Sequence, residues 1–153
     1  GGKQSRYMSL IKKTQIEDKF IFTGKITEGM NEVYSAGDVL VHPTYYDPFS
    51  NVCLEAMSYG LPVITTEING FSEIMKNEIH GYTVPDPADN RKISTFMEKL
   101  SNREIRMKMS ENCLSASRRF TTDSHIDSLL NIYREVYKSK KRGLDSLAVK
   151  DIL

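Results

Sequence analysis

Two carboxylates eight residues apart, Asp47 and Glu55, stand in the segment DPFSNVCLE between two apolar runs. A carboxylate accepts paired hydrogen bonds, and neighbouring hydroxyls on a sugar ring are partners of matching geometry. The pair therefore fits a ligand clamp. It also fits a purely structural role, because Asp-Pro commonly begins a turn and a Glu near a helix start is favourable for the helix dipole alone. Spacing by itself leaves both interpretations open.

The segment between the two carboxylates is predicted to start a helix. Ser50 fits the N-cap, with Phe49 and Leu54 at the positions of a hydrophobic staple. The free amides of residues 51–53 would point back into the preceding loop and form a site for an anion or a hydroxyl oxygen. Side chains of a helix tilt toward its amino end, so the Glu55 carboxylate should lean toward the same opening.

Apolar runs and helical patterns alternate along the first half of the chain. We predict helices at 3–15, 28–37, 50–59 and 70–77, strands at 18–24, 38–43 and 61–66, and a last short strand with a turn at 80–87. The run at 38–43 is nearly continuous, which is typical of a strand buried on both faces. In the helix at 50–59, spacing places four residues on the face toward the sheet: Val52, Cys53, Ala56 and Met57.

The second half of the chain, from residue 88, is helical in pattern. Its last helix is predicted to be capped by Thr122 or Asp123 and to carry an amphipathic face formed by Ile126, Leu129, Leu130, Tyr133, Val136 and Tyr137. Strands that alternate with helices predict an α/β fold with a mostly parallel sheet covered by helices. Such sheets bind ligands beyond the carboxyl ends of their strands, where the loop at 42–51 lies.

Composition narrows the class of protein. The chain has 153 residues, 39% of them hydrophobic and 27% charged, which fits one globular domain. Its net charge of +1 gives no field for nucleic acid. Cys53 and Cys113 have neither disulfide-framework nor metal-ligand spacing, and we see no membrane span or signal peptide, so a cytoplasmic location is expected.

We make separate predictions for the two ends of the chain. GGKQSRYMSLIKK begins with two glycines that would suit the turn after a strand, so we expect this chain to be a piece of a longer protein, cut just after the first strand of the domain. An affinity-tag remnant is the alternative. We predict one domain over 1–142 and a tail of uncertain order over 143–153. The basic run at 138–142 fits a solvated helix end or a peripheral contact with an anionic membrane.

A longer pattern connects these features. SAGDVLVHPTYYDPFSNVCLEAMSYGLPVITTEINGFSEIM, followed by HGYTV, resembles the carboxy-terminal domain of glycosyltransferase family 4, the retaining group 1 sugar transferases. The match runs from Gly24 to Val84. HPTYYDP followed by LEA is most similar to the branch of lipopolysaccharide-core glucosyltransferases. The resemblance implies a Rossmann-like sheet that forms the second half of a GT-B fold.

The resemblance also implies roles for single residues. Asp47 and Glu55 would be the catalytic pair, with Asp47 on hydroxyls of the transferred sugar and Glu55 on the ribose. The amides of Ser50, Asn51 and Val52, next to Phe49, would meet the sugar and the diphosphate. Gly24, Lys25 and Ile26 would lie beside the base. The donor would be a nucleotide-diphosphate sugar, UDP-linked as in UDP-glucose, bound without a metal or other cofactor.

Two departures from the family pattern limit the expectation. Asp47 stands where the family usually has Glu, so its carboxylate is withdrawn by about one bond length. The Arg and Lys that hold the diphosphate, and the groups that meet a glycan or lipid-linked acceptor, belong to parts of the family that precede residue 1. We therefore expect this chain to be inactive without an amino-terminal domain. A nucleotide-sugar epimerase of the same architecture and a degenerate, non-catalytic binding module remain alternatives.

Four other polar residues carry weaker expectations. His42 is expected to be structural rather than catalytic, His80 a turn residue and His125 a helix-surface residue, with no metal-ligand spacing among them. Glu73 fits equally a position near the donor and the first turn of its own helix.

Overall fold

The computed structural model describes residues 4–150, apart from the side chains of Arg6 and 142–150. The chain forms two compact units, 1–33 and 34–153, which are described separately. In the first unit, α1 (Gln4–Thr14) is followed by η1 (Glu17–Lys19) and an irregular segment. The helix predicted at 3–15 is therefore confirmed. α2 (Met30–Ala36), predicted at 28–37, spans the boundary between the units.

The strand predicted at 18–24 is wrong. After η1, residues 20–27 are irregular. The apolar letters of FIF suit a strand, but a strand also needs a neighbour to which it can donate a ladder of hydrogen bonds. The sheet of the described residues consists of β1, β2 and β3, and residues 20–27 pair with none of them.

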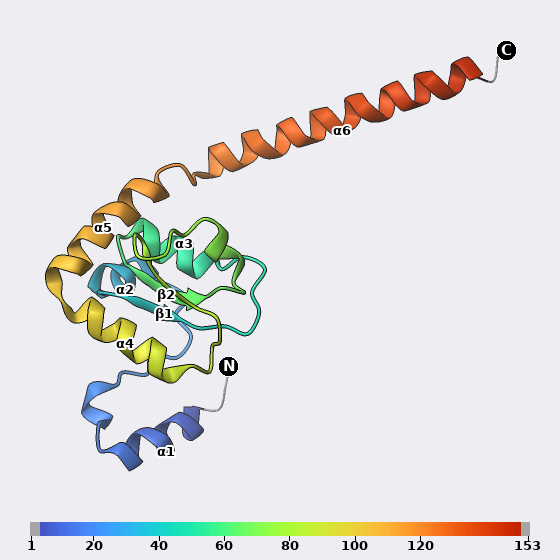
Figure 1. Cartoon of the computed structure of the whole chain (residues 1–153). Helices are drawn as coiled ribbons and strands as arrows, with labels where there is room; N and C mark the ends of the chain where they lie inside the picture. Colours follow the sequence, from blue (N-terminus) through green and yellow to red (C-terminus); the bar gives the residue numbers. More distant parts are fainter. Residues whose placement is uncertain (1–3, 151–153) are drawn as a thin grey trace. The chain divides into compact units, whose positions relative to one another are not determined.

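The second unit contains a three-stranded parallel sheet in the order β1-β2-β3 (Figure 1). The strands are β1 (Leu40–His42), β2 (Val63–Thr66) and β3 (Gly81–Val84), close to the predicted runs. β2 is buried throughout, because it lies between the other two. β1 lies at the edge of the sheet and its Val41 is exposed, so the expectation of burial on both faces was wrong for this strand.

Helices flank this sheet. α3 (Asn51–Ser58) connects β1 to β2, and η2 (Gly70–Glu73), a short 3-10 helix, replaces most of the helix predicted at 70–77. α4 (Asn90–Ser101) packs on β3, and α5 (Arg103–Ser117) packs on α3 and α4. The core joins these layers through a cluster of Ile64, Tyr82, Val84, Ile93, Leu100 and Met109.

The buried face of α3 follows the predicted spacing with one exception. Cys53, Ala56 and Met57 are fully buried, whereas Val52 is exposed. The first turn of α3 is therefore covered on the Cys53 side only. Cys53 and Cys113 are buried free thiols on α3 and α5, as their positions in the pattern predicted.

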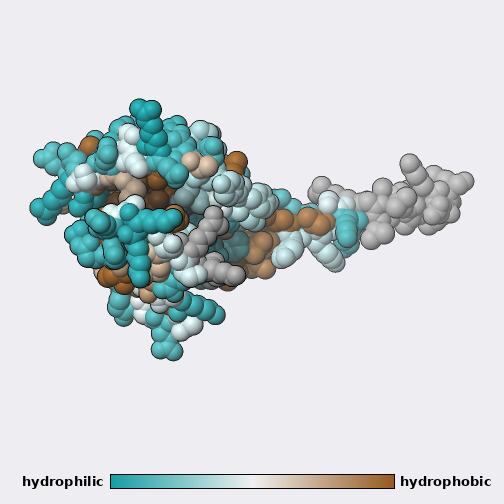
Figure 2. Space-filling view, turned by 90° about the horizontal axis from the view of Figure 1, so that it is seen from below, coloured by the Kyte–Doolittle hydropathy of each residue, from teal (hydrophilic) through white to brown (hydrophobic). Residues whose placement is uncertain are grey.

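The last helix, α6 (Thr122–Lys150), continues beyond residue 142, where the basic run was expected to end the pattern. Its cap is Thr121 rather than either predicted residue, since Thr121 Oγ1 accepts from the Ser124 amide at 3.2 Å. The predicted amphipathic face is present but exposed, and Figure 2 shows apolar side chains along this helix. Residues 151–153 lie outside the described residues. In the described part, no helix combines the length and apolarity that a membrane crossing requires.

Candidate functional site

The loop that follows β1 and the loop that follows β2 are hydrogen-bonded to each other at the carboxyl edge of the sheet. The Gly70 amide donates to the Asp47 carbonyl at 2.9 Å, and Asp47 and Asn69 form an isolated parallel bridge. Thr66 Oγ1 adds a hydrogen bond to the Thr44 carbonyl at 2.8 Å. Because ligands of parallel sheets bind at this edge, the fastening places Asp47 where a ligand would lie.

The buried side chain of Asn69 lies at the centre of this contact between the two loops. Its side chain is fully buried, its Oδ1 accepts from the Phe71 amide at 3.0 Å, and its Nδ2 donates to Thr65 Oγ1 at 2.9 Å. Nδ2 also lies 3.7 Å from Cys53 Sγ on α3. Burial raises the pKa of the Cys53 thiol, which therefore stays neutral here. One amide thus joins β2, α3 and the start of η2.

The Asp47 carboxylate is held at the mouth of α3. Its Oδ1 accepts from the Phe49 amide at 3.1 Å, and its Oδ2 lies 3.8 Å from His42 Nε2. The side chain remains 28% exposed, so it is ordered by the protein yet reachable from solvent. The His42 carbonyl accepts from Thr65 Oγ1 at 2.9 Å and so joins β1 to β2, while its imidazole faces Asp47. The expectation that the His42 side chain is structural stays a prediction.

The start of α3 lies directly after this carboxylate. Ser50 is the N-cap residue, as predicted, but its hydroxyl accepts no capping hydrogen bond. Its carbonyl accepts from the Cys53 amide at 3.1 Å, so Cys53 does not offer the free amide that was expected. The amides of Asn51 and Val52 precede that first helical bond and are the ones that a ligand oxygen can reach.

Glu55 lies one turn further along and has a partner of its own. Tyr34 Oη donates to Glu55 Oε2 at 2.8 Å, and the Tyr34 ring stacks on Tyr59 with centroids 5.4 Å apart. Burial, reinforced by the hydrogen bond to Glu55, raises the pKa of Tyr34 to about 12. The phenol therefore stays protonated at neutral pH and holds one carboxylate oxygen. Within the described part of the chain, Oε1 makes no hydrogen bond.

The structure brings most of the predicted site residues together. The segment 47–52 around the start of α3 contains Asp47, Phe49, Ser50, Asn51 and Val52, and Glu55 lies on the same helix. Gly24, Lys25 and Ile26 belong to the other compact unit, where Gly24 has a left-handed φ of 68°. Their place beside a base stays a prediction.

His80 and Glu73 are the other polar residues with predicted roles. His80 lies at the end of a turn, as predicted, and it is buried there, with its Nδ1 accepting from the Lys76 amide at 3.1 Å. Burial lowers the pKa of His80, and the charges of Lys76 and Arg119 lower it further. Glu73 ends η2 and is exposed. No group of side chains with metal-binding geometry occurs among the residues that were described.

Two residues important to the site were missed at the level of sequence. Tyr34 reaches Glu55 across 21 positions, and Asn69 reaches Cys53 across 16, so local spacing carries no sign of either contact. The only available signal for Asn69 was its place in a loop at the carboxyl end of a predicted strand.

Known proteins resemble this chain over most of its length. Lipopolysaccharide glucosyltransferase WaaG of Escherichia coli is 28% identical over 112 residues, which are 72% of this chain and 29% of that protein. A D-inositol 3-phosphate glycosyltransferase of Saccharomonospora viridis is 32% identical over 104 residues, 67% of this chain and 24% of the relative.

A solved structure is also similar to this chain over most of its length. Sucrose-phosphate synthase from Thermosynechococcus elongatus superposes with a TM-score of 0.80 at 26% identity, and the superposition covers 91% of this chain and 35% of that protein. The chain thus spans a quarter to a third of the length of these three relatives. The predicted fold, the carboxy-terminal half of a GT-B architecture, is confirmed.

The sequence profile of the family described as glycosyl transferases group 1 matches residues 1–116, which include both loops of the site and all of α3. This chain therefore belongs to the group 1 glycosyltransferase family.

Proposed function

We propose that this domain binds the nucleotide-diphosphate sugar donor, a UDP-sugar, of a retaining hexosyltransferase. Asp47 would hold hydroxyls of the transferred sugar, and Glu55 would hold the two ribose hydroxyls. The amides of Asn51 and Val52 would meet the oxygens of the sugar and diphosphate. Such binding uses carboxylates and amides of the chain itself and calls for no metal or other cofactor.

One observation carries the proposal: the hydrogen bond from Tyr34 to Glu55. Tyr34 fixes Oε2 at 2.8 Å and leaves Oε1 to a ligand. A carboxylate held in one orientation loses less conformational entropy when a pair of hydroxyls binds it. The glucosyl transfer named for WaaG supports a hexose as the transferred group.

Donor titration tests the role of Glu55. Glu55→Gln should weaken binding of UDP-glucose to the 153-residue chain about 10- to 100-fold, because hydrogen bonds to a charged acceptor contribute roughly 1.5–3 kcal/mol. Isothermal titration calorimetry measures this change. Glu111→Gln, at an exposed position on α5, is the matched control and should bind like wild type. Equal affinity of the two variants would contradict the proposal.

A second variant, Tyr34→Phe, tests in the same titration whether the hydrogen bond to Glu55 supports binding. It removes the donor to Glu55 Oε2 and keeps the stacked ring. We expect a loss of about 3- to 10-fold in affinity, smaller than that of Glu55→Gln because the carboxylate remains. In the double variant the two losses should not add, since Tyr34 acts through Glu55. Fully additive losses would show that Tyr34 acts on the fold and not on this carboxylate.

We further propose that sugar transfer requires more than this chain. A glycan or lipid-linked acceptor and the donor diphosphate need positioned partners, and holding both reactants is what makes transfer fast. The purified 153-residue chain is expected to bind UDP but to form no transfer product from UDP-glucose, as measured by release of UDP in a coupled assay. Turnover by this chain would refute the expectation.

A further inference from the structure

The imidazole of His42 and the carboxylate of Asp47 face each other at the carboxyl edge of the sheet. His42 Nε2 lies 3.8 Å from Asp47 Oδ2, and the two side chains are 36% and 28% exposed. Because a carboxylate only accepts hydrogen bonds, the tautomer that turns an Nε2–H donor toward it is favoured. The pair thus presents one donor and one acceptor, both of which a ligand can reach from solvent.

The backbone beneath this pair is fixed by the neighbouring strand and loop. The His42 carbonyl accepts from Thr65 Oγ1 at 2.9 Å. The Asp47 carbonyl accepts from the Gly70 amide at 2.9 Å, and its Oδ1 accepts from the Phe49 amide at 3.1 Å. Oδ2 is therefore the carboxylate oxygen that remains on the side of His42. Groups that are already positioned lose less conformational entropy when a ligand binds them.

The separation of 3.8 Å between Nε2 and Oδ2 suits one bridging atom. It is longer than a direct hydrogen bond, which spans about 2.7–3.2 Å, yet a single oxygen can lie at hydrogen-bond distance from both atoms. That oxygen has to accept from Nε2–H and donate to Oδ2. A hydroxyl does both, whereas an ammonium group only donates and a carboxylate only accepts. The pair therefore matches a ligand hydroxyl.

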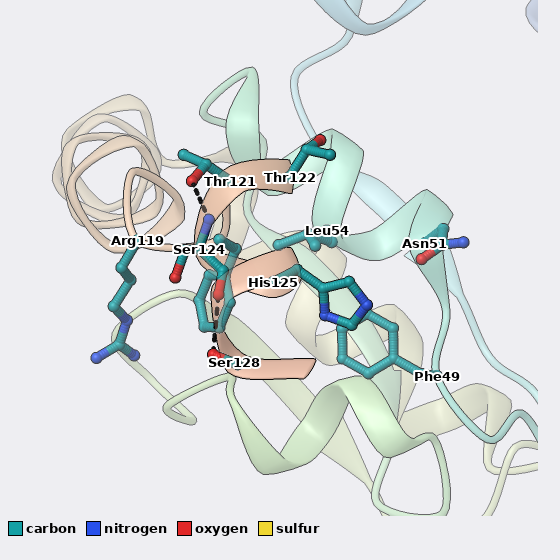
Figure 3. A pocket seen from close by; sticks show the side chains of 10 residues that line it. Phe49, Asn51, Leu54, Arg119, Thr121, Thr122, Ser124, His125 and Ser128 are labelled. Atoms are coloured by element: carbon teal, nitrogen blue, oxygen red, sulfur yellow. Dashed lines mark hydrogen bonds between the residues drawn. The ribbon is translucent and has the colours of Figure 1, made fainter. Parts of the chain in front are cut away.

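The pair lies outside the cavity of about 640 Å³ between the first turn of α3 and the start of α6, which Figure 3 shows. Phe49 and Leu54 line that cavity from the α3 region, and His125 lines it from α6. Neither His42 nor Asp47 belongs to its lining. His125 is thus a second, exposed histidine near the start of α3 that is not part of the pair.

We propose that His42 binds the transferred sugar of the donor: its Nε2–H donates to the same sugar hydroxyl that donates to Asp47 Oδ2. The inference rests on the proposed function, which places Asp47 on hydroxyls of this sugar, and adds the imidazole as a second contact and a free hydroxyl as the requirement there. Aspartate suits this role, because a glutamate at 47 would carry its carboxylate about one bond length further from the backbone. The His42 carbonyl serves the sheet, and the imidazole serves the ligand.

Titration of the 153-residue chain with UDP-glucose and with UDP tests the inference. The ratio of the two affinities measures the contacts to the sugar, and UDP-glucose should bind wild type more tightly. His42→Leu removes the donor and should reduce this ratio about 3- to 10-fold, since one hydrogen bond is lost. The affinity for UDP alone should change less than about 2-fold, because UDP has no group that reaches the pair.

Two further variants separate the hydrogen bond from effects on the fold. His42→Gln supplies an amide donor on a side chain of similar reach, so it should keep at least about half of the wild-type ratio. His125→Leu makes the same change as His42→Leu at the histidine outside the pair and is the matched control. It should leave both affinities within about 2-fold of wild type.

Several results would overturn the inference: equal affinity of wild type for UDP and UDP-glucose, an unchanged ratio in His42→Leu, equal losses for both ligands, or equal ratios in the Leu and Gln variants at 42. A loss in His125→Leu as large as that in His42→Leu would do the same. UDP binding that is weakened by Glu55→Gln reports the proposed donor site without any sugar. If that dependence holds while the ratio ignores His42, only the role of His42 is wrong. If UDP does not bind, or binds independently of Glu55, the proposed function fails and this inference fails with it.

Discussion

Asn69→Asp is expected to destabilise the second unit by roughly 3–5 kcal/mol at pH 7, because it places an uncompensated carboxylate in the interior. The substitution keeps Oδ1, which accepts from the Phe71 amide, and replaces only the Nδ2 donor. Thr65 Oγ1 already donates its one proton to the His42 carbonyl, so it cannot donate to the new oxygen as well. Two acceptors would then face each other in a fully buried position.

The loss should depend on pH in a defined direction. Burial raises the pKa of a carboxyl above its unfolded value of about 3.9, and here the oxygen in place of Nδ2 would face another acceptor. The folded state of the variant then holds a proton that the unfolded state releases. Stability therefore falls by up to about 1.4 kcal/mol per pH unit, from about pH 4 until the folded pKa is passed.

Urea unfolding at pH 4.5, 6 and 7.5, followed by circular dichroism, measures this dependence. Asn90→Asp is the control, because Asn90 is exposed at the first position of α4, where a carboxylate is tolerated or favourable. The two variants should converge in stability at the lowest pH and separate as the pH rises. A constant difference between them would rule out a buried, titrating carboxyl.

The parts of the fold that could be predicted are those in which local letters decide the structure. VLVH is an apolar run closed by Pro43, and VITT is a β-branched run that follows Pro62; they form β1 and β2 as expected. DPFSNV begins α3 with Ser50 at the N-cap. In each case a few neighbouring residues determine the element, so the local sequence is sufficient to predict it.

The parts that could not be predicted depend on partners distant in the chain. FIF at 20–22 has strand composition, yet a strand exists only when a neighbour accepts its hydrogen bonds. His80 lies in the predicted turn, but its burial depends on a distant partner, because the chain around it packs against α5, where Cys113 Sγ donates to the His80 carbonyl at 3.3 Å. The spacing of Asp47 and Glu55 left both a clamp and a structural role open, and the family resemblance favoured the clamp. The groups that orient these carboxylates, Tyr34 and the loop at Asn69, were not predicted.

That loop leads to the second large effect. Gly70→Ala is expected to weaken donor binding at least about 10-fold and to cost roughly 2–4 kcal/mol of stability, because an added methyl has no space. A Cβ on Gly70 would lie 1.8 Å from the Pro48 carbonyl oxygen and 2.7 Å from its carbon. Both atoms are backbone, so no rotamer change can relieve the overlap. The two loops must separate, which breaks the hydrogen bond from the Gly70 amide to the Asp47 carbonyl.

This separation moves the site as well as weakening the fold, and a second glycine distinguishes the two effects. Gly60 follows α3 at its other end with φ 78°, and a Cβ there would meet Ser110 Oγ at 2.7 Å and Leu114. Gly60→Ala should therefore also lower stability, through strain and through crowding of movable side chains. It leaves Asp47 and the start of α3 in place, so UDP-glucose should still bind the folded fraction.

The comparison is made at a temperature where both variants are folded by circular dichroism, with affinity measured by titration calorimetry. Gly70→Ala should bind UDP-glucose at least about 10-fold more weakly than Gly60→Ala at matched stability, since displacement of a positioned group by about 1 Å is enough to lose its contacts. Equal affinities would mean that the Asp47 loop reaches its binding position without being fastened to Gly70. The contact between the loops that follow β1 and β2 would then have no role in holding Asp47 in its binding position, whatever its effect on stability.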